Sequence, residues 1–226
     1  MSYGDLVKEL NELIGLKGSP VAVKLVKNAE EIPEDYEKVG EKKRHCEFVQ
    51  DARLKGNKGY ATSEEHLCKG GAGVMGIEAL PENVASGGMY YKLGNFETSE
   101  GARDTVNAIP KVEEKYYASL YAPLECAEFD PDVIVLILTP KQALKVSQAY
   151  LRKKGGRISN DYSGIQSVCA DAVAAVKERG IPNMTLGCNG SRKFAEIADE
   201  EVIIGLPPEK LEDIVEALKI FKEKWG

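Results

Sequence analysis

The sequence predicts an α+β protein in which a mixed β-sheet is flanked by helices. Short apolar segments rich in β-branched residues are interspersed with longer segments whose apolar residues recur at helical spacing, and this pattern predicts the class. Composition agrees, because 226 residues with 43% hydrophobic and 29% charged residues are typical of a folded globular chain. We expect residues 1–226 to form a single domain.

The first half is expected to begin with an amphipathic helix over residues 6–14, which Gly15 and Gly18 end. Residues 20–26 follow as a strand because valines and a leucine alternate there. Further elements are expected as a helix headed by Cys46 and ending near Gly56, a short strand at 59–62, one helical turn from Ser63 before Cys68, and strands at 89–98 and 116–122. The segment from Cys68 to Gly76 holds four glycines in nine residues, which predicts a loop or a close-approach turn.

The second half begins with a strand at 132–138 that is apolar on both faces, as expected for a central strand covered on both sides. Thr139 is a typical helix cap before Pro140. The remaining elements are expected as a helix from Pro140 to Gly155-Gly156, a helix at 168–176 closed by Gly180, strands at 184–187 and 201–206, and a helix at 211–221.

The two halves resemble each other, which suggests an internal duplication with copies at 20–123 and 131–207. Each copy has an apolar strand, a helix headed by a cysteine, a glycine and then a Cys-x-Gly turn. The two cysteines are separated by 22 positions in the first copy (46 to 68) and by 19 in the second (169 to 188). A duplication predicts a pseudo-twofold core, whereas the alternative is a chance match between two strand–helix–turn units.

Charge and hydropathy exclude several classes of function. The longest apolar run, residues 133–138, is far shorter than the ~20 residues of a membrane-spanning helix. Residues 1–17 carry acidic side chains among the apolar ones, unlike a signal peptide, so we expect a cytoplasmic protein. A net charge of -6 offers no basic surface for DNA or anionic lipid, so we expect neither nucleic acid nor membrane as a partner.

The cysteines are the most informative residues. Five cysteines in a reducing compartment are not expected to form a disulfide framework, and Cys126 has no counterpart in the other half. In each half one thiol lies near a helix start and the other at a glycine turn, where backbone N–H groups favour the thiolate. Pseudo-twofold packing would bring four of them, Cys46, Cys68, Cys169 and Cys188, together as metal ligands.

Four thiolates can hold either zinc or an iron–sulfur cluster. The chain lacks the C-x-x-C knuckles of structural zinc, and a cluster accepts ligands from well-separated loops, so the spacing favours iron, with the 4Fe-4S type expected. The alternative is that the cysteines are inert core residues, since cysteine is among the most buried residue types.

Other residues near the cysteines are candidates for binding. Both histidines, His45 and His66, lie beside candidate ligands and could replace a ligand, donate to sulfur or shuttle a proton. Backbone amides at Gly70, Gly71, Asn189 and Gly190 could hold a small anionic ligand together with the Arg192 guanidinium. Residues 71–76 also match the dinucleotide-binding pattern G-x-G-x-x-G, which suggests a third interpretation, a nucleotide-dependent oxidoreductase. No strand precedes these residues, and this weakens that interpretation.

Several of these motifs resemble those of one family. They are His45-Cys46-Glu-Phe-Val, Glu-His66-Leu-Cys68-Lys-Gly-Gly, Tyr121-Ala-Pro-Leu, Phe129-Asp-Pro-Asp-Val-Ile, Val168-Cys169-Ala-Asp-Ala-Val and Leu186-Gly-Cys188-Asn-Gly-Ser-Arg192. Together they resemble the uncharacterised ArCR family, a domain of unknown function of archaea and bacteria, over nearly the whole chain. The resemblance implies a cytoplasmic single-domain protein, common in anaerobic archaea. It implies that the four cysteines act as one set, and it supplies no reaction.

The sequence therefore predicts a cytoplasmic iron–sulfur protein. Its role would be electron transfer with a redox partner protein, or redox or Lewis-acid chemistry on a small anionic ligand if one iron is left open. The alternative is a structural-zinc or metal-free interaction protein without catalytic activity.

Overall fold

The computed structural model describes residues 1–225 and confirms the α+β class. Six strands form one sheet in the order β2-β3-β1-β4-β6-β5. They are β1 (Val21–Val26), β2 (Gly59–Thr62), β3 (Ala118–Pro123), β4 (Val133–Leu138), β5 (Asn183–Thr185) and β6 (Val202–Leu206). Every pairing between these strands is antiparallel, so the expectation of a mixed sheet was wrong in this detail. Of these six strands, only β2 with β3 and β5 with β6 are both neighbours in the sheet and consecutive strands of the chain.

The strand order is symmetric about the central pair β1 and β4. On one side the chain runs β1, α2, β2, α3 and β3, and on the other β4, η3 with α8, β5, α9 and β6. The helices are α2 (His45–Lys55), α3 (Lys69–Val74), η3 (Ser167–Ala174), α8 (Ala175–Arg179) and α9 (Asn189–Lys193). A duplication would produce this arrangement; the duplication itself and its boundaries stay a prediction.

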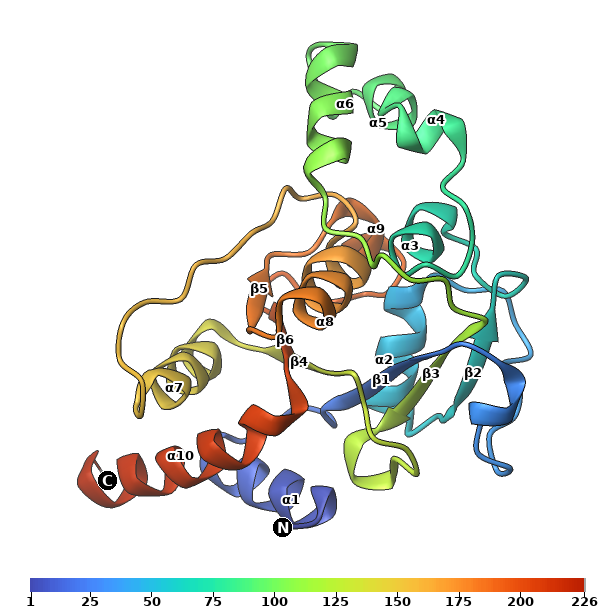
Figure 1. Ribbon diagram of the computed structural model, residues 1–226. Helices are drawn as coiled ribbons and strands as arrows, with labels where there is room; N and C mark the ends of the chain where they lie inside the picture. Colours follow the sequence, from blue (N-terminus) through green and yellow to red (C-terminus); the bar gives the residue numbers. More distant parts are fainter. Residues whose placement is uncertain (226) are drawn as a thin grey trace.

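Helices cover both faces of the sheet (Figure 1). Strand β4 shows why, because Val133, Val135 and Ile137 pack on one face while Ile134, Leu136 and Leu138 pack on the other. One face carries α2, α3 and η3, and the other carries α1 (Tyr3–Ile14), α7 (Pro140–Leu151) and α10 (Leu211–Trp225). Among residues 1–225, no helix has the length and apolar character needed to cross a membrane.

Several helix ends lie where the sequence placed them. Thr139 Oγ1 accepts a hydrogen bond from the Gln142 N–H, and Pro140 is the first residue of α7. Gly56 and Gly180 end their helices in the left-handed conformation that glycine adopts readily. Helix α7 ends at Leu151, a few residues before the glycines at which we expected it to stop.

Two segments differ from expectation. The stretch after Cys68 forms α3 instead of a loop, since its glycines allow close packing: a Cβ at Gly73 would lie 2.5 Å from Leu80 Cδ2. The predicted strand at 89–98 is instead α5 (Gly88–Lys92) with a following turn, between α4 (Glu82–Ala85) and α6 (Ser99–Ala108). Its tyrosines favour strands, but packing of Tyr90 into the core decides the local structure.

Helix η3 lies directly on β6. A Cβ at Gly205 of β6 would overlap with the carbonyl group of Ala172 in η3, so only glycine allows this approach. The helix is of the π type, in which an extra residue widens the turn and which is frequent at functional sites. Gly205 therefore determines how closely the helix that carries Cys169 lies against the sheet.

We expect Gly205→Ala to lower the free energy of unfolding by about 3 kcal/mol, since overpacking of this kind requires backbone movement. The matched control is Gly40→Ala, because a Cβ at Gly40 meets no atom within 4 Å. Urea denaturation of both variants measures the effect. Equal unfolding free energies for the two variants would contradict the packing described here.

Candidate functional site

Four cysteines line one cavity of about 490 Å³ on the face of the sheet that carries η3. Cys46 lies in the first turn of α2 and Cys169 in the first turn of η3. Cys68 and Cys188 are the N-cap residues of α3 and α9. All four are free thiols, and each half of the sheet contributes two of them.

Backbone N–H groups at the helix starts donate to two of the sulfur atoms. The Gly71 N–H lies 3.4 Å from Cys68 Sγ, and the Ser191 N–H lies 3.4 Å from Cys188 Sγ. A Cβ at Gly71 would lie 3.4 Å from Cys169 Sγ and 3.7 Å from Cys68 Sγ, in ordinary van der Waals contact with both. Thiols from the two halves of the chain therefore meet at Gly71.

Burial and mutual proximity control the ionisation of the thiols. Burial raises the pKa of Cys46, Cys68 and Cys169, and the charges of the neighbouring thiols raise it further. Burial also acts to raise the pKa of Cys188, but the polar groups of Ser167 and Ser191 near its sulfur stabilise the thiolate more strongly, so that pKa is lowered. Converting all four to thiolates in this buried place requires a compensating positive charge.

Within residues 1–225, no three or more Cys, His, Asp or Glu side chains are arranged to hold one metal ion. Four thiolates bound to one zinc at about 2.3 Å would lie only about 3.8 Å from one another. The four cysteines lie on the walls of the cavity.

Several other residues singled out by the sequence lie at the same cavity, namely His45, Gly71, Asn189 and Gly190. His45 is buried, and its Nδ1 lies 2.8 Å from the Tyr121 hydroxyl. Its Nε2 has no hydrogen-bond partner within residues 1–225. Burial, with a smaller effect of His66, lowers the pKa of His45 to about 3, so the ring is neutral.

His66 lies outside the cavity wall. Its Nε2 lies 2.9 Å from Ser119 Oγ, and the Ser119 hydroxyl donates to the Tyr121 hydroxyl at 2.8 Å. The two histidines are thus the ends of a buried hydrogen-bonded chain, and burial lowers the pKa of His66 to about 4. Gly70 does not line the cavity either. It lies close to a residue that does, because a Cβ at Gly70 would be 3.3 Å from Nε2 of Gln166.

Arg192 does not line the cavity. Its guanidinium donates to the carbonyl oxygens of Leu186, Ile197, Ala198 and Glu201. The expectation that it binds an anionic ligand is therefore corrected: its donors hold the chain that follows α9. The sequence could not show this, because the accepting carbonyls are brought together only by the fold.

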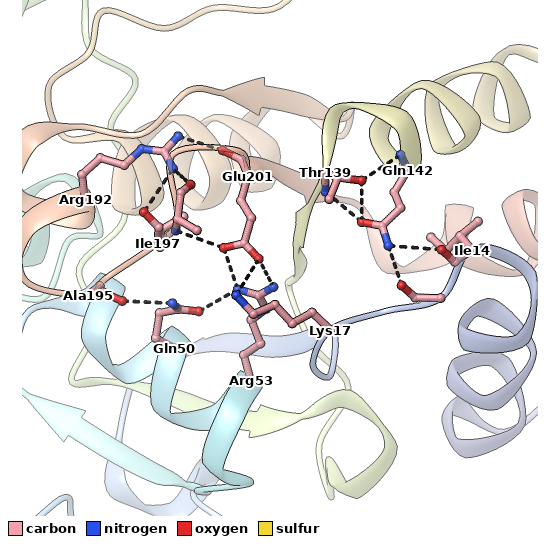
Figure 2. A network of polar contacts seen from close by, with 12 residues as sticks. Ile14, Lys17, Gln50, Arg53, Thr139, Gln142, Arg192, Ala195, Ile197 and Glu201 are labelled. Atoms are coloured by element: carbon pink, nitrogen blue, oxygen red, sulfur yellow. Dashed lines mark hydrogen bonds and ion pairs between the residues drawn. The ribbon is translucent and has the colours of Figure 1, made fainter.

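A buried polar network joins the two halves of the site (Figure 2). Gln50 of α2 donates to the carbonyl oxygen of Ala195 at 2.9 Å. Arg53 of α2 forms an ion pair with Glu201 at 2.5 Å, and both side chains are almost fully buried. The Glu201 carboxylate also accepts from the Ala198 N–H at 3.1 Å. The helix that carries Cys46 is thereby tied to the segment between α9 and β6.

The remaining walls of the cavity were not predicted from the sequence. They are formed by Arg44, by Met89, Tyr90, Leu93 and Asn95, by residues 164–168, and by Ser191, Lys193 and Phe194. The Arg44 guanidinium carbon lies 3.5 Å from the centre of the Phe194 ring, which links the start of α2 to the end of α9. Arg44 precedes His45 in the sequence, and this position was a signal that Arg44 lines the cavity. The segment at 89–95 gave no such signal, because it was expected to be a strand.

Comparison with known proteins confirms the family resemblance. Residues 9–217 match the family described as uncharacterised ArCR. The chain belongs to this family. It is also 58% identical over 219 residues to an uncharacterised protein of Methanocaldococcus jannaschii, covering 96% of this chain and 94% of that protein. No solved structure shows significant similarity to this member of the ArCR family.

Replacing Arg53 alone in this ArCR chain would leave the Glu201 carboxylate buried with only Lys17, at 3.8 Å, as a cation. We expect Arg53→Met to lower the free energy of unfolding by about 3–5 kcal/mol, and the double variant with Glu201→Met to recover a large part of that loss. Urea denaturation measures both. The control is Lys58→Met, which removes an ion pair of two partly exposed groups and should have little effect. An Arg53→Met variant as stable as the control would show that the buried pair does not hold the two halves together.

Proposed function

We propose that this ArCR-family protein holds an iron–sulfur cluster of the 4Fe-4S type through Cys46, Cys68, Cys169 and Cys188. One observation carries the proposal: four thiols from separate helix starts line the same cavity. Cysteine thiolates are the ligands of such clusters. They can come from distant parts of the chain, as they do here.

The size of the cavity supports a polynuclear group over a single ion. A cluster is several ångströms across, so its ligands must be spread over the wall of a cavity of some size. The cysteines line a volume of about 490 Å³, and no compact arrangement for one metal ion occurs in the described part of the chain.

The protein stabilises negative charge where the thiolates would lie. The N–H groups of Gly71 and Ser191 donate to Cys68 and Cys188, and helix starts favour anions. The positive charge of Arg44 acts to lower the pKa of Cys46 and Cys68 against the larger effect of burial. Gly71 brings its backbone close to two of the sulfur atoms, those of Cys68 and Cys169.

A bound cluster of this type supplies one-electron transfer. The chain's own residues position the four sulfur atoms and keep water away from Cys46 and Cys169, which are buried. With four cysteine ligands no iron is left open, so we propose electron transfer with a redox partner protein or with a small anionic ligand. We also propose a cytoplasmic location, where reducing conditions keep all five thiols free.

Substitution of each cysteine by serine tests the ligand set. We expect Cys46→Ser, Cys68→Ser, Cys169→Ser and Cys188→Ser each to lose most of the iron and acid-labile sulfide measured after anaerobic purification. The matched control is Cys126→Ser, because Cys126 is exposed and lies outside the cavity. Circular dichroism checks that each variant is folded. Full iron content in any one of the four variants removes that residue from the ligand set, and full content in all four refutes the proposal.

A further inference from the structure

The cavity wall carries buried polar atoms that the protein itself leaves without partners. Gln166 Oε1, Ser167 Oγ and His45 Nε2 form no hydrogen bond within residues 1–225. The three residues are 5%, 0% and 2% exposed, and all three line the cavity. A buried polar atom without a partner costs about 1–3 kcal/mol, so native proteins keep few of them. These atoms therefore indicate a ligand with polar groups of its own.

Gln166 is held in an unusual conformation at this wall. Its φ of 52° is in the left-handed region that residues other than glycine rarely adopt. Its side-chain Nε2 donates to the Tyr90 hydroxyl at 2.8 Å, which fixes the amide and leaves Oε1 as a free acceptor. A ligand group that faces Oε1 must donate a hydrogen bond, as a hydroxyl or an amino group does.

Ser167 can bind the same ligand. Its hydroxyl lies beside Cys188 and affects the ionisation of that thiol, yet Ser167 Oγ reaches hydrogen-bond geometry with no described group. A hydroxyl both donates and accepts, so Ser167 can pair with a carboxylate as well as with a hydroxyl.

Two positive charges lie at the same cavity, those of Arg44 and Lys193. Arg44 is paired with Glu47 at 2.9 Å, whereas Lys193 forms no ion pair within residues 1–225 and lies 5.4 Å from the centre of the Phe194 ring. Lys193 is therefore free to bind a carboxylate. The apolar side chains of Met89, Leu93, Ile165 and Phe194 complete the lining and suit an apolar body.

We propose that the cavity binds, beside the cluster, a small organic acid with an apolar body and a hydroxyl or amino group. Lys193 pairs with its carboxylate, and the Gln166 amide accepts from its hydroxyl or amino group. This inference rests on the proposed function and names the class of the small anionic ligand.

The helical segment 82–108 forms part of this binding site. It includes α4, α5 and α6 and stands at the top of Figure 1, away from the sheet. Within residues 1–225, the bond from Gln166 to Tyr90 is the one side-chain hydrogen bond that joins this segment to the rest of the protein. A ligand held by Gln166 would thus contact both the segment and the body that carries the cysteines.

Three related compounds test the proposal on the anaerobically purified protein by titration calorimetry. Mandelate has the carboxylate, the hydroxyl and an apolar ring; phenylacetate lacks the hydroxyl, and mandelamide lacks the charge. We expect mandelate to bind about tenfold more tightly than either of the others, the effect of one lost buried polar contact. Gln166→Leu should bring the affinities for mandelate and phenylacetate close together, and Lys193→Gln should do so for mandelate and mandelamide.

Two controls separate this inference from the proposed function. Lys193→Gln keeps the test decisive if Gln166→Leu does not fold, because Lys193 is an exposed residue outside the core. Iron and sulfide are measured on the same samples and should be unchanged in both variants. Full cluster content with no binding, or with equal binding of the three compounds, overturns the inference alone. Protein without iron overturns the proposed function and this inference with it.

Discussion

The site depends on how the two halves of the sheet meet at the antiparallel pair β1 and β4. This pairing brings α2 and α3 from one half, and η3 and α9 from the other, to one face of the sheet. Because each of these helices has a cysteine in its first turn or as its N-cap, a single arrangement of the backbone brings four thiols to one cavity. The ion pair of Arg53 with Glu201 then ties the two halves together. Within the second half, the close contact at Gly205 fixes how near η3 lies to β6.

In the protein alone, opposing electrostatic effects act on the ionisation of the four cavity thiols. Helix starts and Arg44 favour thiolates, but burial and the nearness of the other thiols oppose them more strongly at three of the four cysteines. A positively charged inorganic centre would resolve this conflict, because metal ligands ionise as the metal binds. The buried polar atoms Gln166 Oε1 and Ser167 Oγ also lack hydrogen-bond partners within residues 1–225, and an inorganic centre alone does not supply these partners.

Local signals predicted much of the fold. Alternation of valines and a leucine predicted the strand at 21–26, and a run that is apolar on both faces predicted the strand at 133–138. Helix caps such as Thr139 predicted helix starts, since these effects act over a few residues. Helix α3 was missed because the low helix propensity of glycine is overcome by contacts with Leu80 and Cys169. The spacing of the cysteines predicted their common location, but Gln166 and the partners of Arg192 depend on contacts between distant segments, which no local pattern reveals.

The most direct test of the central claim is the metal content of the unmodified protein, purified without exposure to oxygen. The account predicts a coloured protein with about four irons and about four acid-labile sulfides per chain, as the 4Fe-4S type requires. A colourless protein with about one zinc per chain, or with no metal, would contradict it.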